Sequence, residues 1–129
     1  MTLLLKPVYF YNLGYLITYL IIRCRVYLGE YQRKIKEEFS ITDIKGNHYV
    51  LVQGKQIIGI VRIMYENGIA DLARVTVIKE YRNQGYGREL MKRVINEVRN
   101  SRKAEIIRLS ISDKAMLDFY QQFGFKENG

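Results

Sequence analysis

The sequence predicts a mixed α and β fold, in which helices flank a mostly antiparallel central sheet. Three observations lead to this prediction: the first third of the chain has helical periodicity, residues 48–78 alternate as strands do, and the remainder follows the order helix, strand, helix. This order is typical of an α+β or mixed α/β arrangement in three layers. The 129 residues suit one domain, 1–129, because no linker-like segment divides them.

The first third of the chain is expected to form two helices. Apolar side chains recur three and four residues apart over residues 13–21, and a second, more polar helix is expected over residues 30–39. Residues 8–22 are rich in apolar and tyrosine side chains, but polar residues and a glycine interrupt them. We therefore interpret this stretch as a buried or half-buried helix of the fold, and neither as a signal peptide nor as a membrane span.

Three strands are predicted next, over residues 48–53, 56–65 and 69–78. A Gly-Lys turn separates the first two, and Asn67-Gly68 between the second and third is a strong hairpin signal. Short turns of this kind join antiparallel neighbours. The three strands should therefore form an antiparallel meander.

The rest of the chain alternates between helix and strand. A helix is predicted over residues 85–100, because its apolar residues form one stripe, and a β-branched strand is predicted over residues 105–111. Asp113 can cap a late helix, and Gly124 suits the C-terminus of that helix.

The composition is that of a soluble globular protein, with 48% hydrophobic and 26% charged residues. Cys24 is the only cysteine and His48 the only histidine. A Cys–His nucleophile is formally open, although neither residue has a supporting local signature. The same scarcity prevents an internal disulfide and argues against a zinc site of thiolates and imidazoles. We expect a reducing, cytoplasmic setting and no metal.

The net charge of +8 suits a nucleic acid, an anionic surface or an anionic cofactor as partner. The basic residues are scattered, so charge alone does not choose among these. We expect no nucleic acid partner, because the chain has no recognition-helix or RNA-binding signature. A nucleic-acid-binding protein stays the less favoured alternative.

A glycine-containing loop lies between the third predicted strand and the helix at 85–100. Glycine lets the backbone approach a ligand closely, and the first amides of a helix lack an acceptor within the helix and lie at the positive end of its dipole. Such a loop suits a pyrophosphate. The candidate contacts are Arg82, Asn83, Gln84, Gly85, Tyr86, Gly87 and Arg88.

Two other phosphate loops are excluded by the residues present. The chain has no Gly-Lys-Ser/Thr, and the dinucleotide fingerprint needs three glycines where only Gly85 and Gly87 are available. A single Gly-x-Gly before a helix is weak evidence, because it is equally typical of a plain turn. Its weight comes from the residues on both sides.

Those flanking residues resemble the GNAT superfamily, the GCN5-related N-acetyltransferases. Arg82-x-x-Gly-x-Gly is similar to the family's Arg/Gln-x-x-Gly-x-Gly/Ala signature, and residues 74–81 match its fourth strand and the run into the loop. Downstream, Phe119-Tyr-Gln-Gln-Phe-Gly-Phe resembles the family's late helix. The resemblance covers residues 48–125, and it is specific because the motifs occur together at the right spacing.

The resemblance implies an acyl-CoA N-acyltransferase fold, with acetyl-CoA or another acyl-CoA as co-substrate and no metal. In the family the fourth strand separates from the fifth, and main-chain groups that correspond to Val75 and Val77 bind the pantetheine arm. Two positions depart from the family pattern. Asn83 replaces a frequent glycine, and Asp113 replaces an Asn or Gln before the late helix, so its carboxylate would weaken a cofactor contact or simply cap that helix.

The resemblance also implies the reaction, direct attack of a neutral primary amine on the thioester. Because an amine is mostly protonated at pH 7, a base or a water chain must remove a proton. Asp71 corresponds to a catalytic glutamate of some relatives, and Glu30 comes from the segment that borders their acceptor site. Tyr120 lies at the position that protonates the departing thiolate. The simpler interpretations are solvated carboxylates and a packed tyrosine.

Finer features leave several alternatives open. Residues 22–30, with Asp43 and His48, are similar to ElaA-like acyltransferases. The chain stops at Gly129 where relatives usually continue into a final strand, and a sheet edge left open there would favour a homodimer. The acceptor is a small-molecule amine or a protein amine, with no membrane partner. A non-catalytic acyl-CoA sensor of the same fold is the main alternative function.

Overall fold

The computed structural model describes residues 3–8, 46–111 and 114–127. The two helices expected in the first third of the chain lie outside these residues, as do Cys24, Glu30 and Asp113. Every structural statement below refers to the described part of the chain.

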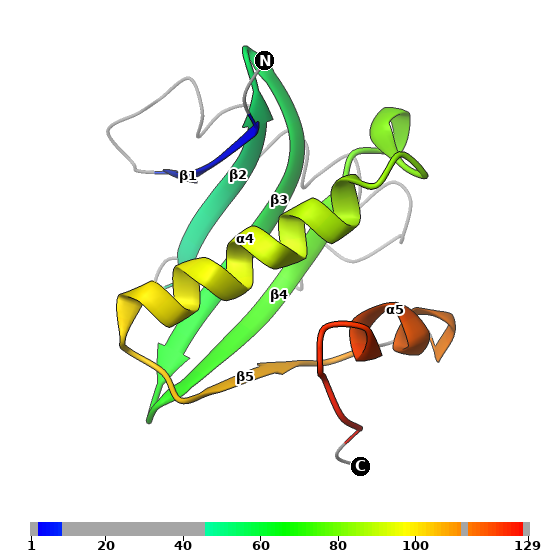
Figure 1. Ribbon diagram of the computed structural model, residues 1–129. Helices are drawn as coiled ribbons and strands as arrows, with labels where there is room; N and C mark the ends of the chain where they lie inside the picture. Colours follow the sequence, from blue (N-terminus) through cyan, green and yellow to red (C-terminus); the bar gives the residue numbers. More distant parts are fainter. Residues whose placement is uncertain (1–2, 9–45, 112–113, 128–129) are drawn as a thin grey trace, which may run out of the picture.

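Five strands form one mixed sheet in the order β1-β2-β3-β4-β5 (Figure 1). The first three pairs of neighbours are antiparallel, and β5 pairs with β4 in parallel. The expected antiparallel meander is confirmed as β2 to β4. The strands are β1 Leu3–Val8, β2 Asn47–Gln53, β3 Gln56–Glu66, β4 Ile69–Val77 and β5 Ile106–Leu109.

Strand β1 was not predicted from the sequence. The helix expected over residues 8–22 was wrong at its first residue, because Val8 ends β1 and pairs with His48. Residues 9–22 lie outside the described part of the chain. Pro7 is tolerated in this strand because β1 is at an edge of the described sheet, where a missing N–H breaks no ladder.

Two short turns set the register of the meander. Asn67 and Gly68 both have positive φ, 52° and 75°, as the two central residues of a type I′ hairpin turn require. The β2–β3 turn contains Gly54 and Lys55 and joins Gln53 to Gln56. The hairpin predicted from Asn67-Gly68 is therefore confirmed.

The helical segments follow the predicted order, with ends that differ by a residue or more. Helix α4 is Tyr86–Ser101, and the late helical region consists of a 3-10 turn, Lys114–Met116, followed by α5, Leu117–Gln121. The predicted loop after β4 contains a further 3-10 turn, Lys79–Tyr81.

One face of the sheet carries the main apolar core. Leu90, Met91 and Val94 of α4 are fully buried there, and Tyr120 of α5 belongs to the same cluster. A second cluster of Val50, Val52, Ile60 and Ile78 lies on the opposite face, because successive residues of a strand point to opposite sides. The confirmed architecture is α+β, with α4 lying across one face of the sheet (Figure 1).

None of the helices in the described residues is long and apolar enough to cross a membrane.

Candidate functional site

Strands β4 and β5 are paired at one end of β4 only. The parallel register begins at Ile69 with Ile106 and ends at Leu72 with Leu109. Beyond Leu72, β4 continues to Val77 with no neighbouring strand on that side in the described sheet, and β5 turns away from it (Figure 1). The two strands therefore form a wedge that opens toward the C-terminal end of β4.

A β-bulge marks the open part of β4. The register with β3 shifts between Ile60 and Arg62, and Arg74 on the opposite strand has a φ of 58°, in the left-handed region. A bulge bends its strand and increases the local twist, so it helps to turn β4 away from β5.

The main-chain groups of Val75 and Val77 face the open side of the wedge. The N–H of Ile78 donates to the Ile58 carbonyl of β3 at 2.8 Å. Because consecutive residues of an antiparallel strand direct their N–H and C=O groups to opposite sides, those of Val77 point away from β3, and those of Val75 follow two residues earlier. The main-chain role predicted for both valines stays a prediction.

Arg82 ties the loop after β4 to the end of the strand. Its Nε donates to the Val77 carbonyl at 2.8 Å. The Val77 carbonyl therefore already accepts a hydrogen bond from this guanidinium. The contact places the positive charge of Arg82 between the open wedge and the start of α4.

The loop from Arg82 to Gly85 contains two residues with left-handed backbone. Asn83 and Gly85 have φ angles of 62° and 87°. Gly85 is the N-cap of α4, and as a glycine it provides no side-chain capping bond. The first intrahelical bond that closes on Gly85 comes from Glu89 at 3.3 Å, so the amides of residues 86–88 lie before it, at the positive end of the dipole.

Helix α5 and the end of β4 both lie beside the start of α4. A Cβ added at Gly87 would lie 3.4 Å from the Phe119 ring and 3.9 Å from Val77. Both distances are ordinary van der Waals contacts, so a small side chain would fit at this position. Tyr120, the next residue, is 8% exposed and its ring meets Phe119 edge-on at 5.1 Å between centroids.

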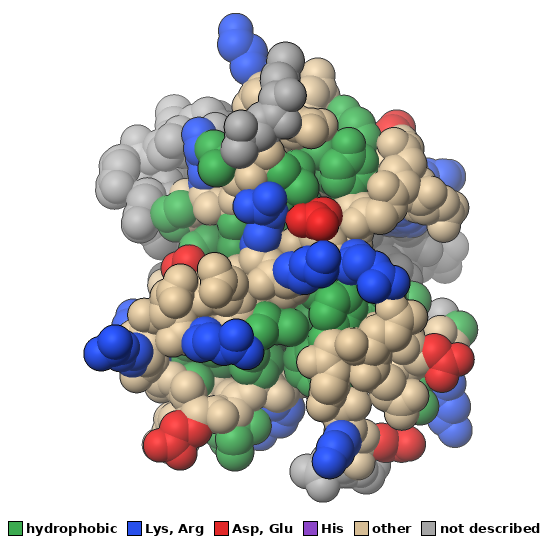
Figure 2. Space-filling view, viewed as in Figure 1, with side chains coloured by type: hydrophobic (Ala, Val, Ile, Leu, Met, Phe, Trp, Pro, Cys, Tyr) green, Lys and Arg blue, Asp and Glu red, His purple; other side chains and the backbone are tan. Residues whose placement is uncertain are grey.

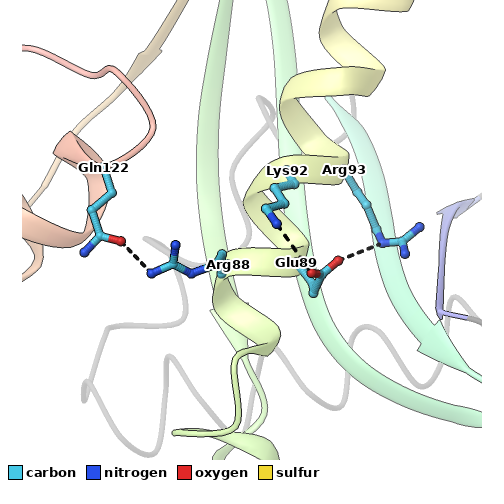
Figure 3. A network of polar contacts seen from close by, with 5 residues as sticks. All are labelled: Arg88, Glu89, Lys92, Arg93 and Gln122. Atoms are coloured by element: carbon cyan, nitrogen blue, oxygen red, sulfur yellow. Dashed lines mark hydrogen bonds and ion pairs between the residues drawn. The ribbon is translucent and has the colours of Figure 1, made fainter.

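A polar contact at the surface reinforces this junction (Figure 3). Arg88 donates from Nη2 to Gln122 Oε1 at 2.7 Å and so links α4 to the residue that follows α5. On the other side of the same turn, Glu89 lies within 4 Å of both Lys92 and Arg93. Arg88 thus points toward α5 and away from the Glu89 carboxylate, which partly neutralises Lys92 and Arg93.

Asp71 lies apart from the phosphate loop, at the narrow end of the wedge. Its carboxylate accepts from Arg108 Nη2 at 3.1 Å, across the paired part of β4 and β5. Its neighbours Ala70 and Leu72 belong to the core on the α4 face, so the Asp71 side chain points to the opposite face. Asp71 and Val77 are six residues apart on β4, or about 20 Å along the strand.

The structure thus joins most of the predicted site residues into one surface. The loop residues, both valines and the α5 region of Tyr120 surround the open wedge, and Asp71 lies beyond its closed end. Glu30 and Asp113 lie outside the described residues. Sequence reasoning missed Arg108 and Gln122, whose contacts join distant segments and leave no local signal.

Positive charge is spread over the side of the molecule that carries α4. Figure 2 shows Lys and Arg side chains over this face, with fewer acidic side chains between them. The described residues contain no group of three or more His, Cys, Asp or Glu side chains that could hold a metal ion.

A wedge between two parallel strands, followed by a glycine loop that opens a helix, defines an acyl-CoA-binding type of fold. Residues 45–127 match the family model of the acetyltransferase (GNAT) domain. This match covers more than half of the chain, and the chain belongs to the GNAT family. No curated protein matches it in sequence.

Solved structures support the same fold at low sequence identity. An acetyltransferase of Trypanosoma brucei is 20% identical, covers 99% of this chain and 95% of its own, and gives a TM-score of 0.70. A GNAT acetyltransferase of Staphylococcus aureus Mu50 is 20% identical, with 99% and 87% covered and a TM-score of 0.73. AAC(6')-Iy, solved with the bisubstrate analogue CoA-S-monomethyl-acetylneamine, is 12% identical, with 98% and 92% covered and a TM-score of 0.73.

Proposed function

We propose that this protein binds acetyl-CoA and transfers its acetyl group to a primary amine. The observation that carries the proposal is the uncapped N-terminus of α4 beside the open wedge of β4. The family match supports acetyl transfer in general. The amine acceptor and the residue roles below are our own assignment.

The wedge and the loop fit the two chemically different parts of acyl-CoA. The pyrophosphate carries negative charge, and the amides of residues 86–88, with Arg82 and Arg88, provide donors and positive charge for it. The pantetheine arm carries amides, and the main-chain groups of Val75 and Val77 face the gap where a strand-like partner would lie. When bound, acetyl-CoA supplies an acyl group activated as a thioester.

The remaining roles fall to side chains of β4 and α5. Tyr120 is assigned to donate a proton or a hydrogen bond to the departing sulfur, because it follows Phe119, whose ring lies beside Gly87 at the start of α4. Asp71 is assigned to accept the proton of the amine, directly or through water. Its 3.1 Å contact with Arg108 orients the carboxylate.

The first test is acetyl-CoA binding by calorimetry, with wild type compared to the double variant Gly85→Asp/Gly87→Asp. Two carboxylates at the helix N-terminus would repel a pyrophosphate, and we expect binding to fall at least about 100-fold. The matched control is Asn96→Asp, which adds a carboxylate to the exposed middle of the same helix. Failure of the folded wild type to bind would overturn the proposal.

The same preparation then separates an enzyme from a sensor. Wild type and Tyr120→Phe are incubated with acetyl-CoA and a panel of amines, and release of the free CoA thiol is followed. Loss of a proton donor typically lowers turnover by about 10²-fold or more. Binding without acetyl transfer to any amine of the panel would favour the non-catalytic acyl-CoA sensor.

A further inference from the structure

The β2–β3 turn is held against the two ends of the phosphate loop. Tyr86, the first residue of α4, donates its hydroxyl to Gln53 Oε1 at 3.3 Å. Tyr81, which ends the 3-10 turn before the loop, donates to Gln56 Oε1 at 2.8 Å. Gln53 and Gln56 are the two residues on either side of the Gly54-Lys55 turn.

The two tyrosines also contact each other. Their rings meet edge-to-face, with centroids 6.1 Å apart and planes at 89°. The loop residues 82–85 therefore begin and end beside the same pair of packed rings. Each ring is bonded to one side of the same hairpin, so the loop is closed at its base by four side chains, which we call the loop clamp: Gln53, Gln56, Tyr81 and Tyr86.

A loop with this backbone shape gains from such a clamp. Asn83 has a φ of 62°, an uncommon conformation for a residue with a side chain, and Gly85 has one of 87°. A free loop would sample other conformations, in which the amides of residues 86–88 and the guanidinium of Arg82 do not converge. A loop that is ordered before the ligand arrives loses less conformational entropy on binding.

We propose that the loop clamp positions the phosphate loop and so sets the affinity for the pyrophosphate of CoA. This inference rests on the proposed function and extends it, because it assigns the β2–β3 turn to the cofactor site. Gln53 and Gln56 are positioning residues, which act through the tyrosines without touching the cofactor.

The test measures CoA binding by calorimetry for Gln53→Ala, Gln56→Ala and Tyr81→Phe. Each variant removes one hydrogen bond of the clamp, and we expect each to raise the Kd about three- to tenfold, in the range of one lost hydrogen bond. The double variant Gln53→Ala/Gln56→Ala should raise the Kd further. Thermal melts of the same samples report folding.

The matched control is Tyr49→Phe. Tyr49 of β2 donates its hydroxyl to Glu97 Oε1 at 3.0 Å and so joins the sheet to α4 far from the loop. This variant also removes a tyrosine hydrogen bond to α4, and it should leave the Kd for CoA unchanged even where it lowers the melting temperature.

A double-mutant cycle shows whether Tyr86 acts through the clamp. In the Gln53→Ala background, Tyr86→Phe should change the Kd by less than twofold, because the bond is already lost. If the wild type binds CoA and the clamp variants bind it equally tightly, the inference is overturned and the proposed function stays intact. A wild type that does not bind CoA would instead overturn the proposed function.

Discussion

The two ends of α4 differ in how they are capped. At the C-terminal end, Ser101 Oγ donates to the Val98 carbonyl at 2.6 Å and accepts from the Lys103 N–H at 3.2 Å. Arg102 follows in the left-handed conformation that ends many helices. At the N-terminal end, the N-cap residue Gly85 has no side chain and makes no side-chain capping bond.

This difference separates stability from function within one helix. A side-chain cap at the N-terminus typically stabilises a helix by about 1 kcal/mol, and this helix lacks one. The uncapped amides are what an anionic ligand would bind. Changes at the C-terminal end should therefore alter folding alone, while changes at the N-terminal end should alter ligand binding.

The largest expected effect comes from reversing charge at each end in turn. Arg88→Glu places a negative charge in the first turn and should weaken CoA binding about tenfold or more. Arg99→Glu makes the same change in the last turn and should leave the Kd within about twofold, because charge effects weaken over this distance in salt. Equal losses from the two variants would contradict a site confined to the N-terminal end.

A smaller effect is expected from Ser101→Ala. The variant removes both bonds of the Ser101 hydroxyl and should lower the free energy of unfolding by about 1 kcal/mol. Urea denaturation measures this loss, and calorimetry should give an unchanged Kd for CoA. A weaker Kd would mean that the C-terminal end of α4 also shapes the site.

The smallest effect should be a gain. Arg102 has a φ of 57° and a ψ of 21°, which glycine adopts without steric cost. Arg102→Gly should therefore raise the free energy of unfolding by about 0.5 kcal/mol, with no change in CoA affinity. Denaturation curves of the two proteins would measure the difference, and a destabilised variant would mean that the Arg102 side chain makes contacts of its own.

Much of the fold could be predicted because its signals are local. Asn67-Gly68 fixes a hairpin through the positive φ of two adjacent residues, and the apolar stripe of α4 follows from helical spacing alone. Strand β1 was not predicted, because a proline such as Pro7 is unfavourable in a strand unless that strand is known to lie at the edge of a sheet. That place depends on pairing with β2, which the sequence of β1 does not specify.

The candidate site divides in the same way. The loop from Arg82 to Arg88 was predicted because its glycines and arginines are adjacent in the chain, and the structure places this loop at the start of α4. The contacts that hold the loop come from elsewhere. Gln53 and Gln122 leave no local pattern, because each meets its partner only after the strands and helices have packed.

The parallel pairing of β4 with β5 also determines the order in which the molecule can assemble. The hairpins of β2, β3 and β4 join neighbours in the chain, whereas β5 reaches β4 only after α4 has crossed the sheet. Closing that longer connection costs more chain entropy, so the meander is expected to form first. The open wedge between β4 and β5 therefore forms only after the meander, when β5 docks beside a strand that is already in place.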